Sequence, residues 1–262
     1  MNIDPTVIND NSNNDALVLE TYLSLVDKEN KFYIDIGSSY EFNLSFERIR
    51  DSSQTIFFEC DPAKTKFYDN PNWNLPNFSL VTDKVSPSNV VSKIQAITDN
   101  TNPKLLDLDI DGYDFFVLEA FLEKISPSLL VAEINEKIPP PIKYTTKYWD
   151  EYMFNMYQHP SHGMSLSKFY ELADKHNYDV INLTFNNVYA VRKDMNPGLK
   201  VFEAQELYDT FYKNPRLAGD APMFHHNKSV DHVLLMEPEE AMDWMRNHYD
   251  MHGFQGFYEL YL

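Results

Sequence analysis

The segment LLDLDIDG, residues 105–112, carries an aspartate at every second position: Asp107, Asp109 and Asp111. In an extended strand this spacing places all three carboxylates on one side. Like charges so close repel one another unless a cation, bound protons or hydrogen-bond donors intervene, so burying them for stability alone would be costly. The pattern favours a chemical role for at least one of them, and Asp109 is our candidate reaction centre, with Asp111 beside it. The alternative is that backbone donors satisfy Asp107 and that Asp111 caps the following helix.

Further polar residues follow the next apolar run. Glu133 and Asn135, together with Asp109, form either a polar rim or a set of oxygen ligands for a Mg²⁺-like ion. His162, just ahead of a predicted helix, is a candidate catalytic base, although surface-loop histidines are the commoner situation. We assign no metal ligand, and three later histidines lack the i, i+4 spacing of a helical zinc site: His225, His226 and His232.

The stretch FYIDIGSS, residues 32–39, reads as a strand that ends in a turn with a single glycine. In an open α/β sheet, ligands bind beyond the carboxyl end of the first strand. Gly37 would let the backbone approach a ligand there, and Asp35 would bind a cationic or hydroxyl-bearing group. By itself, an Asp-x-Gly pattern is as often an ordinary strand end.

Two acids at the ends of later runs strengthen the ligand-binding interpretation. Glu59 lies 24 residues after Asp35, where an acid hydrogen-bonds the ribose hydroxyls of a bound nucleoside, and the neighbouring Asp61 is placed to serve equally. Asp83, just past the third run, is the candidate partner of an adenine amine.

A parallel sheet is needed to bring these residues together. Short runs rich in Ile, Val, Leu and Phe, typical of strands covered on both faces, lie at 31–36, 55–60, 78–81, 105–110 and 129–134. Helical segments separate them at 44–49, 63–68, 90–97 and 115–125. After a triple proline that predicts an extended loop, a helix at 166–175 with Ser165 as its cap precedes two β-like runs, 180–184 and 188–192. The intervening asparagines tolerate positive φ and indicate a hairpin.

The pattern divides the chain into three parts. Residues 1–30 form an arm and a helix, residues 31–195 an α/β domain, and residues 196–262 a C-terminal helical extension packed on that domain. Within the extension, residues 202–212 and 238–249 read as helices.

Composition limits the partners of the chain. Forty acidic against 22 basic residues give a formal net charge of −18, which disfavours nucleic acid and anionic membranes. Since no apolar run reaches about 18 residues and the N-terminus is polar, we expect no membrane insertion. The single cysteine, Cys60, excludes an internal disulfide framework. We therefore expect a cytoplasmic protein.

Over about residues 31–194 the sequence resembles the FkbM-type methyltransferase family. The resemblance is carried by DIGSS at 35–39, by DLDIDGYDFFVLEA at 107–120, by VAEIN at 131–135, and by the segment from His162 to Asp194 with its Ser-Leu helix start and Asn-Asn hairpin. Five parallel strands with a closing antiparallel hairpin are also the order of class I, S-adenosylmethionine-dependent methyltransferases. Two departures from the family's motifs are Glu41, where a second glycine is usual, and Asp107 in place of a lysine.

The resemblance implies a Rossmann-like class I fold with S-adenosylmethionine as methyl donor and a hydroxyl, often of a sugar, as acceptor. The cofactor set that we assign on this basis is Asp35, Gly37, Ser38, Glu41, Glu59, Asp83 and Asp109. The catalytic set is Asp109, Asp111 and His162. Two alternatives stay open. The first is a methyltransferase-like binding or assembly module without catalysis, because Glu41 either binds the cofactor's ammonium group or blocks its site. The second is a metal-assisted enzyme.

Overall fold

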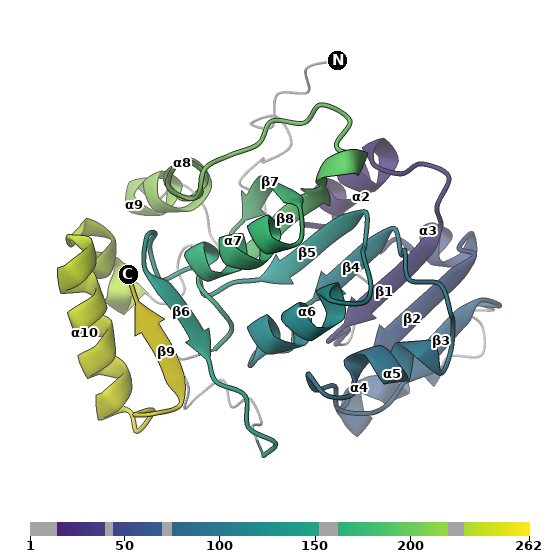
Figure 1. Ribbon diagram of the computed structural model, residues 1–262, viewed down its shortest axis with the longest axis horizontal. Coiled ribbons are helices and arrows are strands. Elements are labelled where there is room, and N and C mark those ends of the chain that lie inside the picture. The colour runs from purple at the N-terminus through teal and green to yellow at the C-terminus, as the bar shows by residue number, and fades with distance from the viewer. Residues whose placement is uncertain (1–14, 40–43, 70–74, 152–161, 220–227) are drawn as a thin grey trace.

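The centre of the molecule is a seven-stranded β-sheet (Figure 1). The computed structural model describes residues 15–39, 44–69, 75–151, 162–219 and 228–262. The strand order is β3-β2-β1-β4-β5-β8-β7, in which β1 to β5 are parallel and β8 is antiparallel to both neighbours. The strands are β1 Phe32–Ile36, β2 Gln54–Phe58, β3 Phe78–Val81, β4 Leu105–Leu108, β5 Leu129–Glu133, β7 Tyr178–Thr184 and β8 Asn187–Arg192. The predicted Rossmann-like class I sheet is confirmed.

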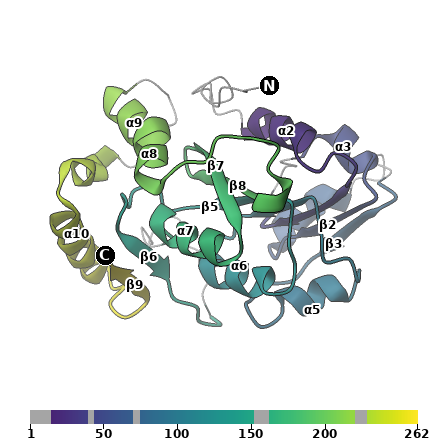
Figure 2. The same ribbon diagram turned by 45° about the horizontal axis from the view of Figure 1, so that its top comes forward.

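Helices cover both faces of this sheet (Figure 2). Along β1, Phe32 and Ile34 join one core cluster whereas Tyr33 joins another, because side chains alternate in direction along a strand. Each face therefore buries apolar side chains and needs its own cover. One face packs against α5 Val90–Gln95, α6 Asp114–Leu122 and α7 Leu166–Lys175, and the other against α2 Asp15–Leu25 and α3 Phe46–Arg50.

Two helix starts test the predicted caps. The hydroxyl of Ser165 accepts a hydrogen bond from the backbone N–H of Lys168 at 3.2 Å, so the predicted cap of α7 is confirmed. Helix α6 begins at Asp114 after Tyr113, so the alternative in which Asp111 caps this helix is wrong. Helix α4 Pro62–Thr65 begins after Asp61, whose carboxylate accepts the N–H of Ala63 at 2.8 Å and fills the cap position.

The hairpin between β7 and β8 forms as predicted, but its turn differs. The residue with positive φ is Phe185, at 51°, and not an asparagine. The partly buried Phe185 ring packs against the main core cluster, and its centroid lies 6.2 Å from that of Tyr212, so this packing offsets part of the backbone strain. Asn186 is used differently, because its side chain reaches across to β5.

The chain after β5 adds a second, two-stranded antiparallel sheet. Strand β6, Lys143–Thr146, pairs with β9, Tyr258–Tyr261, beside helix α10, Pro238–Met251 (Figure 1). A third core cluster lies here, around Tyr144, Met245 and Tyr249. Neither strand is predicted from the sequence, which reads the stretch after the triple proline as a loop. The other elements are η1 Lys66–Asp69, η3 Lys193–Met195, α8 Ala204–Tyr208, a π-helical turn Asp209–Lys213, α9 Asn214–Ala218 and η6 Lys228–Leu235.

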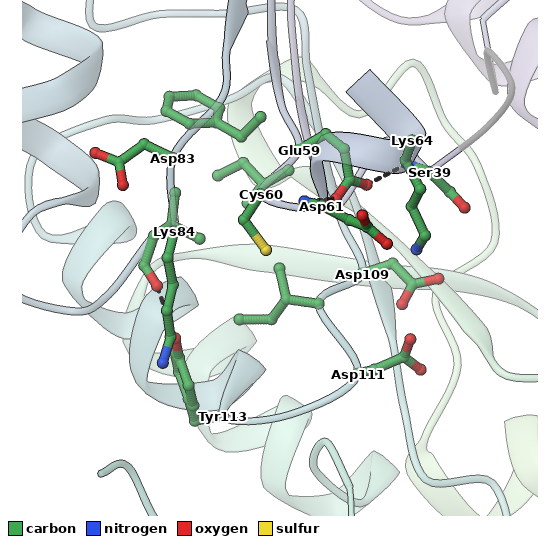
Figure 3. A pocket seen from close by; sticks show the side chains of 15 residues that line it. Ser39, Glu59, Cys60, Asp61, Lys64, Asp83, Lys84, Asp109, Asp111 and Tyr113 are labelled. Carbon is green, nitrogen blue, oxygen red and sulfur yellow. Dashed lines mark hydrogen bonds between the residues drawn. The ribbon is translucent and has the colours of Figure 1, made fainter. Parts of the chain in front are cut away.

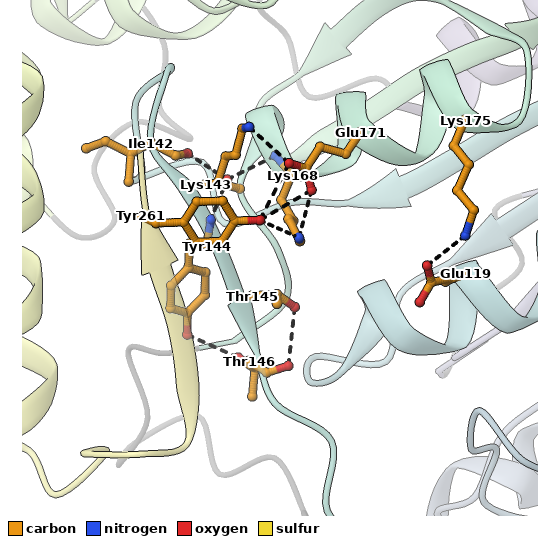
Figure 4. A network of polar contacts seen from close by, with 11 residues as sticks. Glu119, Ile142, Lys143, Tyr144, Thr145, Thr146, Lys168, Glu171, Lys175 and Tyr261 are labelled. Atoms are coloured by element: carbon orange, nitrogen blue, oxygen red, sulfur yellow. Dashed lines mark hydrogen bonds and ion pairs between the residues drawn. The ribbon is translucent and has the colours of Figure 1, made fainter.

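A network of polar contacts joins this second sheet to α7 (Figure 4). The Nζ of Lys168 donates to Glu171 Oε2 at 2.7 Å and to the hydroxyl of Tyr261 at 2.8 Å. Lys143 of β6 lies 3.0 Å from the other Glu171 oxygen. Lys168 also lies 4.5 Å from the centroid of the Phe115 ring on α6. This one ammonium group therefore links α6, α7 and β9.

Among the described residues, no helix has the length and apolar character that a membrane crossing requires.

Candidate functional site

A cavity of about 280 Å³ lies where the carboxyl ends of β1, β2, β3 and β4 meet (Figure 3). From β1 the chain runs to β2 and β3 on one side and then crosses over to β4 on the other side of β1, and open α/β sheets bind ligands at such a reversal of strand order. The lining residues are Ile36, Gly37, Ser39, Phe58, Glu59, Cys60, Asp61, Lys64, Asp83, Lys84, Val85, Asp109, Ile110, Asp111 and Tyr113. We call this the carboxyl-edge cavity.

Gly37 shapes the floor of this cavity. Its φ is 99°, and a Cβ atom added to it would lie 1.6 Å from the backbone carbonyl oxygen of Asp109. Its N–H donates to the carbonyl of Phe58 at 2.9 Å, which fixes the turn against the end of β2. Only glycine allows this close approach, so the turn after β1 is more specialised than an ordinary strand end.

Glu59 ties the turn after β1 to the turn after β2. One carboxylate oxygen accepts the N–H of Ser39 at 2.9 Å and the other accepts the N–H of Asp61 at 2.7 Å. The residue is 5% exposed, and its side chain lies among the lining groups in Figure 3. A carboxylate has about four acceptor positions, so two backbone bonds leave capacity for a ligand. The neighbouring Asp61 already serves as the cap of α4.

The rest of the cavity wall is mixed in character. Asp83 lies on the outer part of the wall, with its side chain 64% exposed and paired with Lys93. Val85, Ile110 and Tyr113 supply apolar surface, and the Tyr113 hydroxyl donates to the carbonyl of Val85 at 2.7 Å. The thiol of Cys60 points into the space between the lining side chains in Figure 3.

Asp35 and Ser38, which the sequence assigns to the cofactor, lie behind the cavity and do not line it. The Ser38 hydroxyl donates to Asp35 Oδ1 at 2.9 Å, while Asp35 Oδ2 is buried with no hydrogen-bond partner. Asp35 lies opposite Asp107 in the β1–β4 register. Burial, and next the charge of Asp107, raises the pKa of Asp35 well above its usual value. Glu41 lies outside the described residues.

The turn after β4 departs from the predicted alternation. Strand β4 ends at Leu108, and Asp111 has a φ of 55°, so the expectation that Asp109 and Asp111 share one side of a strand with Asp107 is wrong. Asp114 imposes this turn, because its carboxylate accepts the N–H groups of Ile110 at 2.9 Å and Gly112 at 2.8 Å.

Asp114 is a structural residue of the site that sequence reasoning missed. It is fully buried, and burial raises its pKa to about 6 against the opposing effect of the two hydrogen bonds. The available signal was an acid directly after Asp111-Gly112-Tyr113, within reach of the backbone donors of a tight turn.

A second group of polar side chains adjoins the cavity at Asp111. Ligand atoms of Asp111, Glu133 and His162 all lie within 4.8 Å of one another, and we call these residues the polar cluster. Glu133 Oε2 and His162 Nδ1 are 3.7 Å apart. The Asn135 side chain donates to the carbonyl of His162 at 3.1 Å and holds the segment before α7 against the end of β5. The structure thus brings together residues from three separate segments that the sequence singles out.

Charge is concentrated in this region. Burial, and next the charge of Glu133, raises the pKa of Asp109 well above its usual value. Burial, followed by Asp111, raises the pKa of Glu133 in the same way. Burial, followed by Lys137, lowers the pKa of His162. The group therefore favours bound protons, a cation or a ligand that donates hydrogen bonds.

Comparison with known proteins adds solved structures that are alike in fold. No protein-family model matches the sequence, and no curated protein matches it. A protein of Klebsiella pneumoniae named as a proposed O-methyltransferase is 13% identical, with 73% of this chain and 91% of that one covered at a TM-score of 0.47. The carbon methyltransferase of CurJ is 8% identical, with 72% and 58% covered at a TM-score of 0.43. An rRNA methylase of Streptococcus thermophilus is 9% identical, with 73% and 98% covered at 0.41.

These proteins act, by name, on different acceptors, and this chain spans less than two thirds of the CurJ methyltransferase. That the chain does not bind nucleic acid stays a prediction, based on its net charge of −18.

Proposed function

We propose that this chain is an S-adenosylmethionine-dependent methyltransferase that acts on a hydroxyl group of a small polar acceptor. The observation that carries the proposal is the pairing of Gly37 and Glu59 at the carboxyl-edge cavity. Gly37 brings the backbone of the first turn to the cavity floor, and Glu59 presents a buried carboxylate at the end of the adjacent strand. This is the arrangement with which α/β folds hold a nucleoside.

The cavity wall suits the parts of the cofactor. Glu59 would accept hydrogen bonds from the ribose hydroxyls, and Asp83 would meet the adenine amine. Val85, Ile110 and Tyr113 provide the apolar surface against which an adenine ring packs.

The methionine end calls for a different partner. Asp35 Oδ2 is buried without a hydrogen bond, and Asp107 lies beside it. An ammonium group nearby would compensate both carboxylates, and the amino group of the cofactor is such a group. Asp35 would then act from behind the turn, with Ser38 holding its carboxylate in place.

A sulfonium-bound methyl group is already activated, and this is the chemistry that the cofactor supplies when bound. The task left to the protein is alignment of the acceptor oxygen with that methyl group. Asp109 and Asp111 line the cavity where the polar cluster adjoins it, so they would hold the acceptor there. Asp109 or His162 would accept the proton that the hydroxyl loses as its oxygen bonds to carbon and the C–S bond breaks, leaving the electron pair on sulfur.

A sugar or a related natural product is the acceptor class that we infer, and this inference together with the FkbM-type assignment rests on the sequence motifs. The closely spaced carboxylates where the polar cluster adjoins the cavity suit a ligand that carries many hydroxyl donors.

Isothermal titration calorimetry with S-adenosylmethionine and S-adenosylhomocysteine tests the proposal. Glu59→Ala should weaken binding by about 1–3 kcal/mol through loss of a charged hydrogen bond. Glu47→Gln, an exposed acid on α3 away from the cavity, is the matched control and should bind like the wild type. Absence of binding at millimolar concentration would overturn the proposal and favour a binding or assembly module instead.

A further inference from the structure

We propose that Asp111, Glu133 and His162 form a binding site for one divalent transition-metal ion, which adjoins the carboxyl-edge cavity at Asp111. The three donors come from three different elements: the turn after β4, the last residue of β5 and the segment that leads into α7. The turn after β4 and the segment before α7 meet because Gly163, next to His162, donates its N–H to the carbonyl of Gly112, next to Asp111, at 2.7 Å.

The distances suit a shared ion. Metal–ligand bonds of this kind are about 2.0–2.2 Å long, so two donors on one ion are at most about 4.4 Å apart. Glu133 Oε2 and His162 Nδ1, at 3.7 Å, already satisfy this limit. All three ligand atoms lie within 4.8 Å of one another, so a side-chain movement of a few tenths of an ångström completes the site.

Glu133 provides an observation independent of the clustering itself. The residue is 5% exposed, and its Oε2 atom, which faces His162, is buried without a hydrogen bond. Leaving such an oxygen without a donor is costly unless something else binds it. Its other oxygen is fixed, because Asn186 donates to Oε1 at 2.6 Å. Glu133 thus has one oxygen held by a neighbouring amide and the other directed at a histidine. A carboxylate that binds a metal and is held by an outer-shell partner has this arrangement.

The donor set indicates the class of metal. One imidazole nitrogen with two carboxylate oxygens is softer than the all-oxygen sets of Mg²⁺ and Ca²⁺ and suits the series from Mn²⁺ to Zn²⁺. Three protein ligands leave positions open for a further molecule.

The role of the ion, unlike its binding, rests on the proposed function. Asp111 lines the cavity, so the open positions would face an acceptor there. A bound ion would hold the acceptor hydroxyl and favour its deprotonation. His162 would then be a ligand, and Asp109 would be left to accept the proton.

Mn²⁺ binding to metal-stripped, full-length protein, measured by electron paramagnetic resonance, tests the site without any need for activity. We expect one ion per chain in the wild type and at least about tenfold weaker binding in Glu133→Gln, His162→Gln and Asp111→Asn. Asn186→Ala, which leaves all three ligands in place, should also weaken binding about tenfold by releasing Glu133. Glu123→Gln, which changes an exposed acid at the C-terminal end of α6, should bind like the wild type.

Circular dichroism identifies any variant that does not fold. Asp111→Asn changes a partly exposed turn residue, so its metal binding is the test if the other ligand variants do not fold. A wild type that binds neither Mn²⁺ nor Zn²⁺ at submillimolar concentration would overturn the site, as would binding that all three ligand substitutions leave unchanged. Calorimetry with S-adenosylhomocysteine separates the two proposals, because loss of metal binding with intact cofactor binding contradicts only the metal site.

Discussion

Gly37 and Asp109 approach each other so closely that a single methyl group on Gly37 would fall 1.6 Å from the Asp109 carbonyl oxygen. The contact joins the turn after β1 to the turn after β4, and so fixes the relation between the floor of the carboxyl-edge cavity and its acidic wall. A side chain at position 37 would therefore force the two turns apart.

Gly37→Ala should therefore be among the most destabilising single changes in the molecule, at about 2–4 kcal/mol, because the backbone of one turn must shift. Gly198→Ala is a matched control, since Gly198 has the same φ of 99° and nothing within 4 Å of its added Cβ. That control should cost about 1 kcal/mol from backbone strain alone. Urea unfolding of both variants measures the difference, and equal losses would show that the contact is not tight in solution.

Asp35 should make the unliganded protein sensitive to pH. Burial raises the pKa values of Asp35 and Asp114, the latter to about 6. Between the unfolded value near 4 and the raised folded value, the folded state binds more protons than the unfolded state. The free energy of unfolding therefore falls as pH rises through this window, by at most about 1.4 kcal/mol per pH unit for each group.

Asp35→Asn should remove part of this slope. We expect the variant to be more stable than the wild type at pH 8 and to bind S-adenosylmethionine more weakly, since it loses both the cost of a buried charge and the partner for an ammonium group. Asp51→Asn, at an exposed acid paired with Lys31, should change neither property appreciably. Thermal unfolding between pH 4 and pH 8 and calorimetry give the two readouts, and a variant with unchanged cofactor affinity would contradict the assigned role.

Cys60 offers a direct report on the cavity because it is the only cysteine in the chain and lines the cavity wall. Burial, and next Glu59, raises the pKa of its thiol, so labelling should require a higher pH than labelling of a free cysteine thiol does. S-adenosylhomocysteine should slow labelling of the wild type and protect Glu59→Ala much less. Labelling rates that the nucleoside leaves unchanged in the wild type would place its binding elsewhere.

Two lysines on α7 should differ in their contribution to stability. Lys168 has a side chain that is 9% exposed and contacts Glu171, Tyr261 and the Phe115 ring, whereas Lys175 is 48% exposed and pairs with Glu119 at 2.9 Å. Lys168→Ala should cost about 1–3 kcal/mol, and Lys175→Ala less than about 1 kcal/mol. Chemical denaturation compares them, and similar losses would mean that Lys168 does not link the second sheet to α7.

The sheet could be predicted from the sequence because its strands are local runs of β-branched and aromatic residues with clear interruptions. Gly37 and Glu59 could likewise be found, since a strand end and its spacing to the next are local patterns. The pairing of β6 with β9 could not, because it joins Lys143 to Tyr261 across most of the C-terminal half, and no local signal encodes a partner so distant.

Individual aspartates were harder to place. The sequence pattern predicts Asp107, Asp109 and Asp111 as one alternating series. In the structure, the Asp114 carboxylate accepts hydrogen bonds from two backbone N–H groups and turns the chain after Leu108. Periodicity describes regular strands only and does not anticipate a side chain that competes for the backbone. The same limit applies to Asp35 and Ser38, whose hydrogen bond to each other holds them behind the cavity.

Five carboxylates and two lysines line the carboxyl-edge cavity, namely those of Glu59, Asp61, Asp83, Asp109 and Asp111 with Lys64 and Lys84. Such a lining distinguishes a ligand that carries a positive charge from the same ligand after the charge has been lost. Methyl transfer converts a sulfonium into a neutral thioether. After the proposed reaction, the acidic lining would therefore bind the demethylated cofactor less tightly than it binds the methyl donor. Product inhibition limits turnover wherever the demethylated cofactor binds as tightly as the methyl donor. The acidic lining of the cavity would reduce this inhibition.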